Sequence, residues 1–176
     1  MSWDLLRDAL MAVLLGVACF TDLTTGKIRN WLTFPSMAVG VVASAALAPL
    51  VWEGAAGLLV AFAVGAALWK FGGAYRAGDV KLVMAAGAIG GPEWVLRGML
   101  IGFLLNFPFA LMVLARRGRL LHFARFVGAL GKAVLYRRPL RSFMEEWESK
   151  TTVIAFGPVI AAGIVAARLQ PWPDIW

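Results

Sequence analysis

The chain has 176 residues, of which 61 % are hydrophobic and 15 % charged, against about 45–50 % and about 25 % in ordinary soluble domains. A soluble domain of about 150 residues buries only about 70 % of its surface, so this apolar excess excludes a soluble enzyme, a disordered chain and a disulfide scaffold. We therefore expect an integral membrane protein whose net charge of +7 orients it in the bilayer, with no role in binding nucleic acid.

Apolar runs in chain order predict an all-α integral membrane protein with about six transmembrane helices in a single domain, 1–176. The runs cover about 3–21, 31–50, 55–71, 80–91, 94–114 and 152–169. Turn residues separate them: Gly26 follows the first helix, Asn30 caps the second, and Gly90-Gly91-Pro92 divides the fourth from the fifth. The fourth run is shorter than the roughly 20 residues that a bilayer needs, so it is extended by flanking residues or begins inside the protein.

The positive charges predict an orientation. Most of the 17 Lys and Arg residues fall in the loops after the first, third and fifth helices. Because Lys and Arg concentrate in cytoplasmic loops, we expect these loops inside and both termini outside.

The loop at about 115–151 is long and basic. It mixes Leu and Phe with Arg and Lys, which favours an amphipathic helix on anionic lipid over a plain linker helix.

Asp22 and Asp79 lie at the predicted cytoplasmic ends of apolar helices, where an ionisable group is costly and therefore a functional candidate. Two neighbouring carboxylates suit aspartic protease chemistry, since one takes a proton from water and the other, protonated, polarises the peptide carbonyl. The helix dipoles favour Asp79 as the general base and Asp22 as the acid. With one Cys (Cys19) and one His (His122), we expect no metal ion and no cofactor.

Three stretches carry a family resemblance. Residues 22–33, DLTTGKIRNWLT, match an Asp followed by an I-x-N-x-L-T helix start that contains Asn30. Residues 78–82, GDVKL, match the end of a GxGD motif and its following Lys, here Gly78, Asp79 and Lys81. Residues 156–161, FGPVIA, match a Y-G-P-x-I-A segment through Gly157 and Pro158. The chain resembles the type IV prepilin peptidases, of the GxGD class of membrane aspartic proteases, over about residues 5–169.

The resemblance implies an endopeptidase of the bacterial inner membrane that cleaves a short basic leader from a prepilin or pseudopilin at the cytoplasmic face. Asp22 and Asp79 would then be its catalytic residues. Arg76 departs from the family, which has the first Gly of GxGD at this position. Bifunctional members carry a further cytosolic domain, often with paired Cys, that is associated with N-methylation. This chain resembles the short form, and methyltransferase activity is not expected.

Two other interpretations stay open. Arg76 is the main support for a degenerate homologue that acts as a membrane scaffold in pilus assembly. An ion-coupled transporter would use the two aspartates as proton carriers, although such proteins often carry internal repeats and none is visible here.

In the long loop, Glu145, Glu146 and Glu148 are candidates for attracting a basic leader, with a solvated acidic patch as the alternative.

Overall fold

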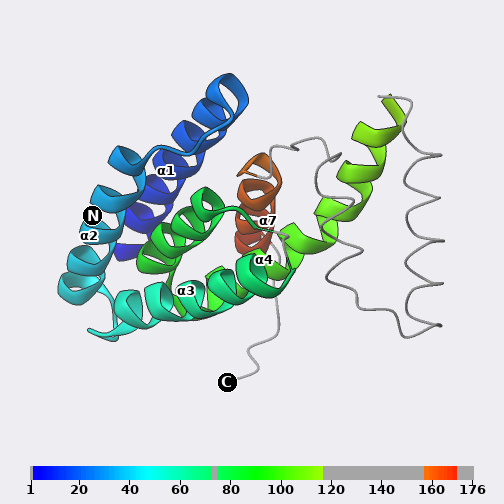
Figure 1. Ribbon diagram of the computed structural model, residues 1–176. Helices are drawn as coiled ribbons and strands as arrows, with labels where there is room; N and C mark the ends of the chain where they lie inside the picture. Colours follow the sequence, from blue (N-terminus) through cyan, green and yellow to red (C-terminus); the bar gives the residue numbers. More distant parts are fainter. Residues whose placement is uncertain (1, 73–74, 117–156, 170–176) are drawn as a thin grey trace. The chain divides into compact units, whose positions relative to one another are not determined.

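The computed structural model describes residues 2–72, 75–116 and 157–169, and these residues form helices joined by short turns, with no strand among them (Figure 1). The helices are α1 (Trp3–Thr25), α2 (Asn30–Leu47), α3 (Glu53–Gly72), α4 (Ala77–Arg116) and α7 (Gly157–Leu169). The predicted all-α class is confirmed. Residues 2–72, 75–106 and 157–169 belong to one compact unit, and residues 107–116 continue α4 into a second.

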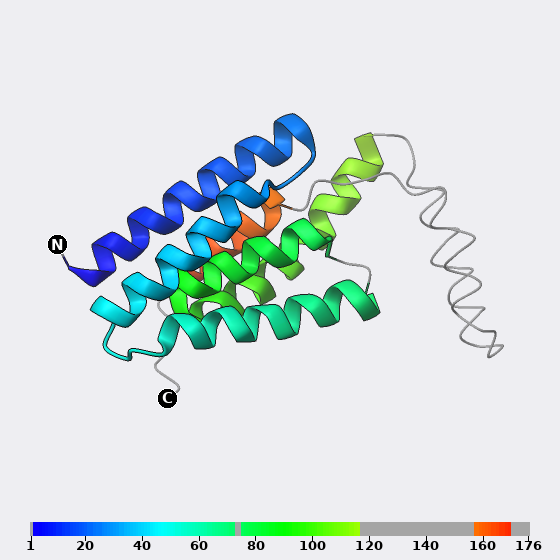
Figure 2. The same ribbon diagram turned by 60° about the vertical axis from the view of Figure 1, so that its left-hand side comes forward.

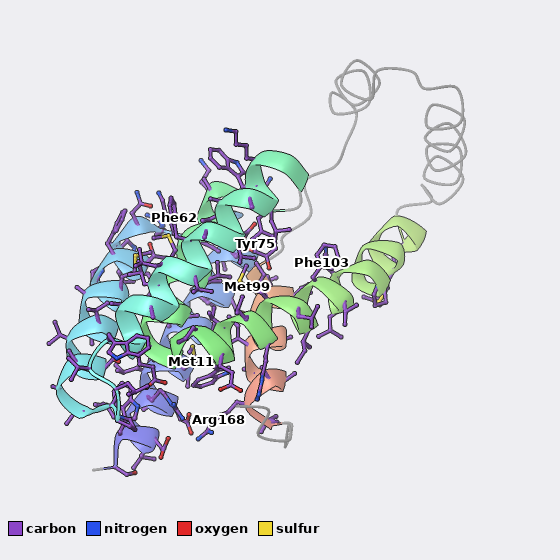
Figure 3. The ribbon with its side chains drawn as sticks, turned by 90° about the horizontal axis from the view of Figure 1, so that it is seen from below. Met11, Phe62, Tyr75, Met99, Phe103 and Arg168 are labelled. Carbon is purple, nitrogen blue, oxygen red and sulfur yellow. The ribbon has the colours of Figure 1, made fainter. Side chains whose placement is uncertain are left out.

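Three stretches of helix are long and apolar enough to cross a membrane: Asn30–Leu47, Glu53–Lys70 and Ala77–Asn106. Large apolar side chains also point outward from the unit, as Phe62 and Phe103 do in Figure 3, where both are about half exposed. Outward apolar side chains of this size suit a lipid environment. Six spans and the side on which the termini lie remain predictions. Most of the 115–151 loop, with Glu145, Glu146 and Glu148, lies outside the described residues.

The predicted division between the fourth and fifth helices lies at Gly91. This residue, with φ 83° and ψ 174°, is not helical and separates 77–90 from 92–116 within α4. A side chain here would be strained, so glycine is required. The chain reverses direction at this point (Figure 2). The first part begins at Ala77 rather than at residue 80, which supplies the flanking extension that the short apolar run needed.

Small residues let the helices approach backbone to backbone. A Cβ atom added to Gly57 on α3 would lie 2.1 Å from the carbonyl oxygen of Gly87 on α4. A Cβ atom on Gly163 of α7 would lie 2.4 Å from the backbone nitrogen of Gly102 on α4. A side chain at either position would clash with the facing backbone. The packing of α3 and of α7 against α4 therefore depends on glycine, as is common where transmembrane helices pack closely.

At one end of the unit, side chains from three helices meet at Trp94. The Arg7 guanidinium of α1 lies 5.2 Å from the Trp94 ring centroid, and that of Arg168 of α7 lies 5.6 Å from it. The Trp94 indole N–H donates to the carbonyl oxygen of Ile164 at 2.8 Å, and Arg168 pairs with Asp8. These contacts join α1, α4 and α7 at the end where α1 begins.

The opposite end of α1 is closed by Gly26. As predicted, α1 ends there, at Thr25, and Gly26 adopts φ 65° and donates its N–H to the carbonyl oxygen of Asp22 at 2.8 Å. The predicted capping role of Asn30 is wrong. Asn30 is the first residue inside α2, Arg29 occupies the cap position without a side-chain hydrogen bond, and the Asn30 amide oxygen instead accepts a bond from Lys81.

We expect Gly57→Ala to destabilise the protein by about 1–3 kcal/mol, because the new methyl group must push α3 away from the α4 backbone. The matched control is Gly16→Ala on α1, where an added Cβ meets nothing within 4 Å. Gly16→Ala should leave stability unchanged or raise it by up to about 1 kcal/mol. Thermal unfolding of the purified protein in detergent measures both, and equal stability of the two variants would contradict the described contact.

Candidate active site

Asp22 is buried in the last turn of α1, with 5 % of its surface exposed. Its carboxylate oxygen Oδ2 accepts a hydrogen bond of 3.1 Å from the backbone N–H of Gly157, the first residue of α7. This N–H is one of those at a helix start that have no partner within the helix. The bond therefore gives a hydrogen-bond partner both to this N–H at the start of α7 and to the buried carboxylate.

Asp79 is buried in the first turn of α4, with 3 % of its surface exposed. Its Oδ2 accepts a bond of 2.9 Å from the backbone N–H of Arg76, the residue just before the helix. An acidic side chain at the third helical position often reaches back in this way. Because the donor is a backbone amide, the Arg-for-Gly departure at residue 76 leaves this bond intact.

The fold brings the two aspartates to the same end of the unit. Asp22 and Asp79 lie within electrostatic range of each other, at the end opposite to the Trp94 cluster. Arg7 and Asp22 are about 22 Å apart along α1 at 1.5 Å per residue. Two carboxylates at one site suit aspartic protease chemistry, in which one is ionised while the other holds a proton.

Two hydrogen bonds across helices connect the three sequence stretches. Gly157 of the third stretch bonds Asp22 of the first, and Lys81 Nζ of the second bonds Asn30 Oδ1 of the first at 3.0 Å. Lys81 Nζ also lies 5.5 Å from the ring centroid of Phe34, which holds its ammonium group over α2. The structure thus gathers residues far apart in the sequence around the two carboxylates.

The remaining motif residues have less defined contacts. A Cβ atom on Gly78 would lie 3.5 Å from Ile28, an ordinary contact, so the described backbone does not itself require glycine there. Pro158 is half-buried at the second position of α7, where its missing N–H costs nothing. The described residues include no group of three or more His, Cys, Asp or Glu side chains that could hold a metal ion.

Comparison with protein families gives the chain its assignment. The model of the type IV leader peptidase family matches residues 9–114, more than half of the chain. The chain belongs to the type IV leader peptidase family. The match covers both aspartates, Asn30 and Lys81, and ends before Gly157. No curated protein and no solved structure matches the chain.

Tyr75 lies near Asp79 of the candidate site and was not singled out from the sequence. It is buried, with 5 % of its surface exposed, and its hydroxyl has no hydrogen-bond partner in the described part of the chain. Burial, and then the nearby Asp79 carboxylate, raise the pKa of the Tyr75 hydroxyl to about 12. The one signal in the sequence was its position four residues before Asp79, which no general rule marks as functional.

The predicted division of roles between the aspartates considered only the helix that carries each one. In the structure, Asp22 also lies at the N-terminus of α7, where the helix dipole favours an ionised carboxylate. Asp79 lies at the N-terminus of α4. Each carboxylate thus accepts one backbone N–H at a helix start, and the dipole argument no longer separates a general base from an acid.

We expect Gly157→Ala to lower peptidase activity strongly. The added Cβ atom would lie 2.6 Å from Asp22 Oδ2 and would displace the carboxylate from its hydrogen bond. A misplacement of about 1 Å in an active site costs up to about a hundredfold in rate. Cleavage of a leader-bearing substrate measures the effect.

Gly78→Ala is the folding control for this prediction, because its Cβ atom meets only an ordinary contact. It should unfold at the temperature of the wild type. If Gly157→Ala cleaves as fast as the wild type, Asp22 does not need the position described here.

Proposed function

We propose that this leader peptidase is an aspartic endopeptidase that removes the short basic leader from prepilin-like proteins, with Asp22 and Asp79 as its catalytic pair. The observation that carries the proposal is the pair itself. Two carboxylates are buried at one end of an apolar helical unit, in electrostatic range, and each accepts one backbone N–H. Membership of a leader peptidase family also supports a peptidase.

The pair suits peptide hydrolysis by a bound water molecule. The ionised carboxylate takes a proton from the water as the water oxygen bonds to the scissile carbonyl carbon, while the protonated carboxyl gives its proton to the carbonyl oxygen. A tetrahedral diol forms. As its C–N bond breaks, the amine nitrogen receives the proton taken from water, and a diol hydroxyl returns a proton to the second carboxylate. The products are an acid and an amine, and the pair regains its starting state.

The charges near the pair support cleavage at the cytoplasmic face of the bacterial inner membrane. Lys27 and Arg29 follow Asp22 in the turn after α1, and Arg76 and Lys81 flank Asp79. Positive residues concentrate on the cytoplasmic side of membrane proteins, where a basic leader also stays. Anionic lipids at that face are the expected lipid partners. The proposed reaction needs no cofactor and no nucleic acid, and the proposed function does not extend to methyl transfer.

The scaffold alternative rested on Arg76. The contact at this position involves the backbone N–H, which Arg provides as well as Gly does. The departure therefore gives little reason to propose a protein that has lost its activity.

We expect Asp22→Asn and Asp79→Asn each to abolish leader cleavage, because asparagine keeps the shape of the side chain but cannot exchange the proton. The double variant should be little worse than either single one, since the two groups act as a unit. Co-expression with a candidate prepilin, followed by the leader-sized mobility shift, measures cleavage.

The matched control for these variants is Asp4→Asn on α1. Asp4 is exposed at the far end of the same helix, where it pairs with Arg7. This variant should cleave like the wild type. Cleavage by Asp79→Asn would show that the two aspartates are not the catalytic pair and would favour the scaffold function.

A further inference from the structure

The Tyr75 hydroxyl is a buried polar group without a hydrogen-bond partner among the described residues. Its residue is 95 % buried, and no described donor or acceptor reaches the oxygen. Removing a hydroxyl from water without giving it a hydrogen bond carries its full desolvation penalty. Such groups are rare in native structures, and each one calls for a specific reason, of which a catalytic role is one.

The position of Tyr75 supplies a reason. It immediately precedes Arg76, whose backbone N–H binds Asp79, so Tyr75 lies one residue from the donor that holds this carboxylate. Its phenol also lies within electrostatic range of that carboxylate. Figure 3 shows Tyr75 away from Met11 and Arg168, which mark the opposite end of the unit.

The other buried side-chain atoms without partners among the described residues lie elsewhere. They are Trp3 Nε1, Arg7 Nε and Asn106 Oδ1. Trp3 and Arg7 are in the first turns of α1, far along the helix from Asp22. Asn106 has a second polar group on its amide and is only half-buried. Tyr75 is the one that stands beside an aspartate of the candidate pair.

The chemistry of the phenol limits what it can do. Burial and the Asp79 carboxylate raise the pKa of the Tyr75 hydroxyl to about 12, so the group is protonated across the physiological range. It cannot serve as a base there. It is a neutral donor of one hydrogen bond in a site shielded from water, where such a donor acts most strongly on developing negative charge.

We propose that Tyr75 is a further catalytic residue, whose hydroxyl donates a hydrogen bond to the carbonyl oxygen of the scissile peptide bond as water attacks. This inference rests on the proposed function, since it assigns a donor to the same hydrolysis. The carbonyl oxygen gains negative charge before the protonated aspartate delivers its proton, and a preorganised donor stabilises that charge. The substrate would also give the phenol a hydrogen-bond acceptor, which no described residue supplies.

The test is Tyr75→Phe, which removes one oxygen and keeps the ring. With a purified prepilin substrate in detergent, kcat should fall by about tenfold to a hundredfold with KM changed less than about twofold, because the bond strengthens in the transition state. The unfolding temperature should be unchanged or higher, because the substitution removes a buried hydroxyl that no described residue hydrogen-bonds.

Trp94→Phe is the control for loss of a structural donor. Its indole N–H bonds the Ile164 carbonyl oxygen at the far end of the unit, so this variant should lower the unfolding temperature and leave kcat near that of the wild type. A Tyr75→Phe protein with the kcat of the wild type would overturn the inference. So would a loss of kcat that came with a lower unfolding temperature, since Tyr75 would then be structural.

The same assay separates this inference from the proposed function. If the wild type cleaves and Asp79→Asn does not, the proposed function stands, and Tyr75→Phe alone decides the inference. If Asp79→Asn cleaves like the wild type, the proposed role of the aspartate pair is wrong, and so is the role of Tyr75 that depends on it.

Discussion

A carboxylate buried between apolar helices needs a hydrogen-bond donor, and Asp22 obtains one from Gly157, which lies 135 residues further along the chain. Leaving a buried acceptor unpaired carries a desolvation cost of about 1–3 kcal/mol, and more when the group is charged. The bond fixes where α7 begins against α1, and it leaves no room for a side chain at residue 157. The candidate site and the closure of the helical unit are therefore parts of the same contact.

The rest of the unit keeps this contact in place. Gly91 turns the chain back within α4, so that its first part carries Asp79 in its first turn and its second part returns along α7. Glycine contacts at Gly57 and Gly163 let α3 and α7 pack directly against the α4 backbone. The cluster of Arg7 and Arg168 around Trp94 holds the same helices at their other end, away from the chemistry.

Local signals in the sequence predicted the helical class, the end of α1 at Gly26 and the break at Gly91, because a turn residue acts through its own backbone. They also placed Asp22 and Asp79 at helix ends on one side. The donor to Asp22 was not predicted, since Gly157 reaches this carboxylate only through tertiary packing. Asn30 was assigned to its own helix start for the same reason, although it bonds Lys81 across helices. The burial of the Tyr75 hydroxyl, with no hydrogen-bond partner among the described residues, could be seen only in the structure.

Infrared difference titration of the carboxyl band tests most directly whether Asp22 and Asp79 form one coupled pair. Spectra of the wild type would be compared with those of Asp22→Asn and Asp79→Asn in detergent. Coupled groups titrate as a pair, so removal of either aspartate should change the pH at which the other one titrates. If the band of each remaining aspartate titrates as it does in the wild type, the two carboxylates are independent and the account of the site is wrong.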